Sequence, residues 1–179
     1  MKSTIRLHLL NRDDFIMPDI RHPCPPASGL CAHPRLQGKP YVEFLRDRLI
    51  PVEEKAKKYT LDNTEEECIA KIKVDKGLLN TASGKKADYL LIRCEHDIAY
   101  FVELKGCDVA KACEQILSTI DLLQNIVGSA QSINARIVCS RVSTPDIRSS
   151  PYIRLEKHCK TKNGTLLVRT RQYSEPCNG

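Results

Sequence analysis

Apolar side chains recur every three or four residues after Pro40, and this spacing places them on one face of an α-helix. Pro51 lies inside the pattern and predicts a kink or a division into two helices, because proline lacks the amide hydrogen that a helix interior needs. We therefore predict helical structure over residues 40–59. The apolar positions of the pattern are Tyr41, Leu45, Leu49, Val52, Ala56 and Tyr59.

Three strands are predicted next along the chain. Residues 68–74 alternate between apolar and polar side chains, as in a strand with one buried face. Residues 87–93 are apolar almost throughout, which is typical of a strand covered on both faces. Residues 99–105 form the third strand, and Gly106 ends it.

A long helix is predicted to begin after Asp108, which suits a helix N-cap, and to end at Gly128. A fourth strand follows at residues 135–140, then a short helix at residues 152–162 and a last strand at residues 165–171. This order of elements predicts an α/β fold, with one central mixed β-sheet and helices on both of its faces.

Prolines separate an N-terminal arm from this domain. Six of the ten prolines fall between Pro18 and Pro40, where they prevent long regular structure. We expect residues 1–39 to form an irregular, proline-rich arm that lies on a domain of residues 40–179. Within that domain, residues 41–140 would form the core and residues 141–179 a C-terminal extension.

Length and composition exclude several classes of protein. A chain of 179 residues with 41% hydrophobic and 28% charged residues forms a globular domain rather than a disordered or fibrous protein. The apolar runs are too short to span a bilayer, and the first residues lack the continuous apolar stretch of a signal peptide. We therefore expect a cytoplasmic protein. The net charge of +6 suits a polyanionic partner, although many unrelated proteins share it.

Cysteine is unusually frequent. Nine cysteines cannot all pair, and their scatter along the chain does not resemble a secreted disulfide framework. We predict reduced thiols, several of them small apolar members of the core.

Charged residues inside the apolar strands are the candidates for chemistry. Glu103 and Lys105 share one face of their strand, and a hairpin with the preceding strand would bring Asp88 beside them. Two converging carboxylates repel each other unless a cation lies between them, and oxygen ligands favour Mg²⁺ or Mn²⁺. A neighbouring lysine orients or deprotonates a water, or stabilises charge on a phosphate. These groups suffice for metal-assisted phosphodiester hydrolysis, whereas an exposed ion pair at a sheet edge is the alternative.

Asp88, fourteen intervening residues and then Glu103-Leu104-Lys105 resemble the motif of the PD-(D/E)xK nuclease superfamily. The resemblance covers roughly residues 41–140 and implies a restriction-endonuclease-like core, with elements in the order αβββαβ. The superfamily's proline before the first aspartate is Ala87 here. The resemblance implies a nuclease that acts on DNA rather than RNA, in phage defence or DNA repair, with a homodimer among its possible states. The alternative is an inactive module of the same fold that binds nucleic acid or protein.

The resemblance also assigns roles to residues. Asp88 and Glu103 would hold Mg²⁺ or Mn²⁺, Lys105 would position the attacking water, and Gln115 matches a glutamine in the following helix of several branches. A third acidic ligand sometimes comes from the first helix, where Glu53 borders the apolar stripe, although a solvated charge is the simpler interpretation of that residue. Basic residues that would contact phosphates are Lys85, Lys86 and Lys111.

The arm contains a second candidate site. The pattern is His-x-Cys, six residues, Cys-x-His, and four such ligands can close a tetrahedral structural Zn²⁺ site that would order the arm. The alternative is a loop whose cysteines and histidines pack on the domain. The four candidate ligands are His22, Cys24, Cys31 and His33.

Overall fold

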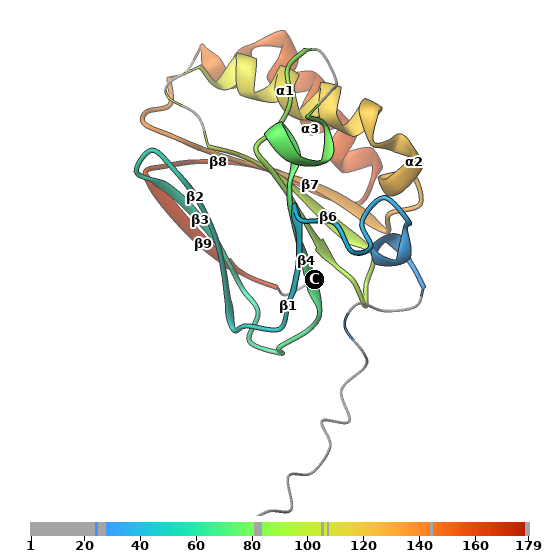
Figure 1. Ribbon diagram of the computed structural model, residues 1–179. Coiled ribbons are helices and arrows are strands. Elements are labelled where there is room, and N and C mark those ends of the chain that lie inside the picture. The colour runs from blue at the N-terminus through green and yellow to red at the C-terminus, as the bar shows by residue number, and fades with distance from the viewer. Residues whose placement is uncertain are drawn as a thin grey trace, which may run out of the picture.

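A six-stranded mixed β-sheet forms the centre of the computed structural model, which describes residues 24, 28–80, 84–104, 106, 108–143 and 145–177 (Figure 1). Its strand order is β1-β4-β5-β6-β7-β8. The strands are β1 (Val42–Leu45), β4 (Ile69–Lys73), β5 (Tyr89–Arg93), β6 (Ile98–Leu104), β7 (Ser132–Cys139) and β8 (Leu166–Thr170). The predicted α/β class with a mixed sheet is confirmed.

The first half of this sheet is antiparallel and the second half is parallel. The pairs β1–β4, β4–β5 and β5–β6 are antiparallel, whereas the pairs β6–β7 and β7–β8 are parallel. The three predicted central strands are β4, β5 and β6, and the two predicted later ones are β7 and β8. Helix α1 makes the crossover between the parallel strands β6 and β7, a connection that needs a helix-length segment.

The helices cover one face of the sheet (Figure 1). They are α1 (Val109–Leu122), the short α2 (Gln124–Val127) and α3 (Ser150–Thr161). Asp108 caps α1 as predicted, because its side chain accepts a hydrogen bond of 2.8 Å from the Lys111 backbone N–H. None of the helices described is long and apolar enough to cross a membrane.

A second, three-stranded sheet covers the opposite face, where we had predicted helices (Figure 1). Its strand order is β2-β3-β9, with β2 (Leu49–Glu54), β3 (Lys57–Asp62) and β9 (Gln172–Pro176). Strands β2 and β3 pair antiparallel, and β9 pairs parallel with β3. One apolar core therefore lies between the large sheet and the helices, and another lies between the two sheets.

The helix predicted over residues 40–59 is wrong, because this segment forms β1, β2 and the start of β3. Buried apolar residues recur at every second position in each strand, at Ile50 and Val52 in β2 and at Tyr59 and Leu61 in β3. Between β2 and β3 the chain reverses at Lys55 and Ala56, which take φ values of 45° and 61°. Such turns usually carry asparagine or glycine, so this one leaves no sequence signal. Pro51 is tolerated because β2 is an edge strand.

The described residues also form three short helical segments, namely η1 (Leu30–Ala32), the π-type turn η2 (Val74–Leu78) and η3 (Asp146–Arg148). Of the predicted arm, residues 24 and 28–39 are described, and Leu30, Cys31 and Leu36 are buried in the helix-side core. This part of the arm therefore packs on the domain.

Candidate active site

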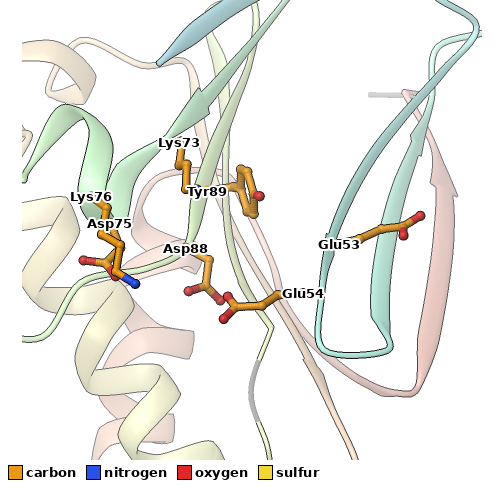
Figure 2. A pocket seen from close by; sticks show the side chains of 7 residues that line it. All are labelled: Glu53, Glu54, Lys73, Asp75, Lys76, Asp88 and Tyr89. Carbon is orange, nitrogen blue, oxygen red and sulfur yellow. The ribbon is translucent and has the colours of Figure 1, made fainter. Parts of the chain in front are cut away.

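A polar cleft of about 220 Å³ lies where β2, η2 and the start of β5 meet (Figure 2). Its walls carry both carboxylates and ammonium groups, a combination that can accommodate a cation together with phosphate. The residues that line it are Glu53, Glu54, Lys73, Asp75, Lys76, Asp88 and Tyr89.

Asp88 and Glu103 lie opposite each other on neighbouring strands. Tyr89 of β5 pairs with Val102 of β6, so the next position in this antiparallel register brings Asp88 opposite Glu103. Asp88 Oδ2 accepts a hydrogen bond of 2.7 Å from the Leu104 backbone N–H, which holds the aspartate against the end of β6. Glu103 is 1% exposed, whereas Asp88 lines the cleft. The predicted hairpin is therefore confirmed, and the metal-binding roles of the two residues stay predictions.

A third carboxylate comes from Glu54 rather than from Glu53. Figure 2 shows the Glu54 carboxylate beside that of Asp88, whereas Glu53 points away from it. Glu53 instead forms an ion pair of 2.6 Å with Lys58, its cross-strand partner. Glu53 would border the apolar stripe only if this segment were a helix, and in a strand two neighbouring side chains point to opposite faces.

Nearby carboxylates act on Tyr89, which also lines the cleft. Burial raises the pKa of the Tyr89 phenol, and the negative charges of Asp88, Glu54 and Glu43 raise that pKa further. Each of the three carboxylates opposes a second negative charge at this position. A cation bound beside Asp88 and Glu54, which line the cleft, would relieve part of this repulsion.

Helix α1 fixes the backbone that leads into Asp88. The Gln115 side-chain amide donates a hydrogen bond of 2.7 Å to the Lys86 carbonyl oxygen. The Thr119 hydroxyl accepts one of 2.8 Å from the Ala87 backbone N–H and donates one of 2.7 Å to the Gln115 carbonyl oxygen. Gln115, predicted to help fix the site, therefore contacts the segment that carries Asp88. Thr119 was missed, because a threonine inside a helix gives no sequence signal of such a contact.

We expect Thr119→Val to lower the free energy of unfolding by about 1–3 kcal/mol, because it leaves the buried Ala87 N–H without its hydroxyl acceptor. Urea unfolding measures this change, and amide hydrogen exchange at Ala87 should accelerate. Ser118→Ala, one position earlier on the same helix, is the matched control and should change stability by less than about 0.5 kcal/mol. Equal effects of the two variants would contradict the role given to Thr119.

The predicted basic contacts fall into three different environments. Lys86 is largely buried, and its Nζ donates a hydrogen bond of 2.9 Å to the Leu79 carbonyl oxygen and lies 3.7 Å from Asp75 Oδ1. Lys85 forms an ion pair with Glu114 of α1. Lys111 is exposed in the first turn of α1. Lys86 therefore supports η2, while Lys73 and Lys76, which were not predicted, line the cleft.

Lys105 was predicted to position the attacking water, and it lies outside the described residues.

The predicted zinc site in the arm is not formed by its four candidate ligands. Cys24 forms a disulfide with Cys68, and Cys31 forms one with Cys94. His33 Nδ1 accepts a hydrogen bond of 3.2 Å from the Arg35 backbone N–H, and His22 lies outside the described residues. Since both cysteine ligands are bonded to other sulfurs, this quartet cannot bind zinc in the state described.

The prediction of reduced thiols holds for some cysteines and is wrong for others. It is wrong for the four disulfide cysteines, whose partners lie 44 and 63 positions away in sequence and so could not be paired from spacing. It is confirmed for four cysteines that are buried and free, namely Cys113, Cys139, Cys159 and Cys177. Cys107 lies outside the described residues.

Divalent metal binding can be tested against the donors present. Within the residues described, no three His, Cys, Asp or Glu side chains are arranged as a ready-made metal site. Asp88 and Glu54 nevertheless bring two carboxylates together at the cleft. Mg²⁺ retains several waters and is often bound by only one or two carboxylates together with substrate phosphates. The donor set therefore fits Mg²⁺ or Mn²⁺ better than a soft metal.

Comparison of the chain with protein-family models, with curated proteins and with solved structures finds no match.

Proposed function

We propose that this protein is a metal-dependent nuclease of restriction-endonuclease-like fold that hydrolyses phosphodiester bonds, with DNA favoured over RNA as its substrate. The observation that carries the proposal is the placement of Asp88 opposite Glu103, with the Glu54 carboxylate beside Asp88 at the cleft. The order β4-β5-β6-α1-β7 supports it, since it supplies the βββαβ part of the expected core. In the described residues, strands take the place of the helix expected before β4.

Residues in and around the cleft would each have a role in such a reaction. Asp88, Glu103 and Glu54 would hold Mg²⁺ or Mn²⁺, which when bound supplies a Lewis acid at the scissile phosphate. Lys73 and Lys76 would bind the neighbouring phosphates of the strand. Lys105 would position the attacking water, and Gln115 and Thr119 hold the backbone on which Asp88 is placed.

The proposal is tested by incubating the full chain with single-stranded DNA, duplex DNA and RNA in the presence of Mg²⁺, Mn²⁺ or EDTA. We expect cleavage of DNA with either metal and none with EDTA. A chain that binds DNA but cuts none of the substrates with either metal would support the inactive binding module instead.

We expect Glu54→Gln to slow metal-dependent cleavage about tenfold, equivalent to about 1.4 kcal/mol of transition-state stabilisation, because the cleft loses one charged oxygen ligand. Glu53→Gln is the matched control, since its carboxylate points away from Asp88 and contacts Lys58. The measurement is the initial cleavage rate across a Mn²⁺ titration. If Glu53→Gln slowed the reaction as much as Glu54→Gln, the assignment of Glu54 would be wrong.

A further inference from the structure

Four cysteines from separate parts of the chain meet at one point of the helix-side core. Cys68 immediately precedes β4 and Cys94 immediately follows β5, while Cys24 and Cys31 come from the arm. The Cα atoms lie 5.6 Å apart in the Cys24–Cys68 pair and 5.5 Å apart in the Cys31–Cys94 pair. Each strand cysteine is therefore matched with one arm cysteine.

The two disulfides are neighbours. Ile69 pairs with Arg93 in the antiparallel register of β4 and β5, so Cys68 lies opposite Cys94, and the Cys94 backbone N–H donates a hydrogen bond of 2.9 Å to the Cys68 carbonyl oxygen. Opposite residues of antiparallel strands project to the same face, with Cβ atoms about 5 Å apart. In a tetrahedral zinc site with Zn–S bonds of about 2.3 Å, sulfurs lie roughly 3.8 Å apart. The spacing of Cys68 and Cys94 across the two strands is compatible with sulfurs at that separation.

We propose that Cys24, Cys31, Cys68 and Cys94 form a redox-gated structural zinc site, which holds two disulfides when oxidised and one Zn²⁺ ion when reduced. Two equivalents of a dithiol reductant would supply four electrons and four protons, opening both disulfides to four thiols and leaving two oxidised dithiols. Binding of Zn²⁺ then displaces the four thiol protons and forms four Zn–S bonds. In the oxidised state shown, the sulfurs are bonded in pairs and are not available to a metal.

Bound zinc would keep the arm attached to the domain when the disulfides are reduced. In a reducing environment the two disulfides would open to four free thiols. Without the two links, the segment around Leu30 and Leu36 would lose its covalent connection to the β4–β5 hairpin. Four thiolates around one zinc ion form a closed site that restores this connection.

The site would be structural rather than catalytic. Cys94 and Asp88 are at opposite ends of β5, about six residues or 20 Å apart along the strand. The zinc proposal is therefore independent of the proposed nuclease activity, and either can fail without the other.

The test is to reduce the full wild-type chain with dithiothreitol under argon, add Zn²⁺, remove unbound metal and measure zinc by mass spectrometry. We expect one zinc ion per chain, which a strong chelator removes. Alkylation followed by peptide mapping should show these four cysteines protected in the zinc form and modified after chelation. Burial raises the pKa of Cys113 to about 12 and of Cys159 to about 11, so those thiols should stay unreactive in both states.

Variants assign the ligands. Cys68→Ser and Cys31→Ser should each reduce zinc content at least tenfold, with circular dichroism confirming that the domain stays folded. Cys139→Ser is the control, because its Sγ already contacts backbone carbonyl oxygens at 3.2 and 3.5 Å, and a serine hydroxyl can replace these contacts. Reduced wild-type protein that takes up no zinc, or that alkylates equally with and without chelator, would overturn the proposal.

Discussion

Replacing Asp88 with asparagine is expected to reduce metal-dependent cleavage at least a hundredfold, equivalent to about 2.7 kcal/mol of transition-state stabilisation. Asparagine has the size of aspartate, and its side-chain oxygen can still accept the hydrogen bond from the Leu104 backbone N–H. The substitution therefore removes a negative charge from the cleft without removing the contact that holds the side chain. Single-turnover cleavage with Mg²⁺ and with Mn²⁺ measures the loss.

Two further variants make this result specific. Asp121→Asn, an exposed substitution on α1, should leave the cleavage rate unchanged. Glu103→Gln should reduce cleavage as strongly as Asp88→Asn, because the register places the two residues opposite each other. Thermal unfolding of each variant shows whether a lost rate reflects a lost fold. Full activity in a folded Asp88→Asn protein would remove the basis of the proposed function.

The antiparallel hairpin that carries the candidate site could be predicted because its signals are local. Residues 87–93 read as a buried strand, Gly106 ended the next strand, and Asp108 marked the start of the following helix. Alternation of side chains along a strand then sufficed to place Asp88 near Glu103. Each of these inferences depends on residues that are close together in sequence. Over such short stretches, the spacing of hydrophobic residues and the residues that cap a helix determine the local structure.

The contribution of Glu54 could not be predicted, because it depends on a turn and on distant pairing. The turn at Lys55 and Ala56 carries no glycine or asparagine, so the segment read as a continuous helix. Strand β3 also pairs with β9, which lies more than a hundred residues further along the chain. The spacing of hydrophobic residues does not reveal such a distant partner. The same holds for the disulfides, whose cysteines are joined by tertiary packing rather than by spacing.

A buried polar network connects the small sheet, and thus the hairpin that carries Glu54, to the central sheet. Arg136 of β7 forms an ion pair with Glu175 of β9, and the Tyr59 hydroxyl of β3 donates a hydrogen bond of 2.6 Å to the same carboxylate. The Arg136 guanidinium also lies over the ring of Tyr100, 5.3 Å from its centroid. Burial acts to lower the pKa of Arg136, but the hydrogen bond and charge of Glu175 outweigh it and raise that pKa. The arginine therefore stays charged between the sheets.

Glu175→Ala is expected to lower the free energy of unfolding by about 3–5 kcal/mol, because it leaves the Arg136 charge buried without its carboxylate partner. Tyr59 loses its acceptor at the same time, and burial together with Glu175 raises the pKa of this phenol, so the hydroxyl stays protonated and needs a new partner. Urea unfolding at neutral pH, followed by circular dichroism, measures the change.

Two comparisons distinguish the effect of breaking the buried ion pair on stability from the effect of removing any glutamate side chain. Glu156→Ala breaks the exposed pair with Lys160 on α3, at 3.1 Å, and should cost less than about 0.5 kcal/mol. The double variant Arg136→Met, Glu175→Leu should be more stable than Glu175→Ala alone, because it removes both charges and fills the space with apolar atoms. Glu175→Ala could instead lower the free energy of unfolding no more than Glu156→Ala does. In that case the polar network would not be what holds β9 against the central sheet. The position of Glu54 beside Asp88 would then depend on the apolar contacts between the two sheets.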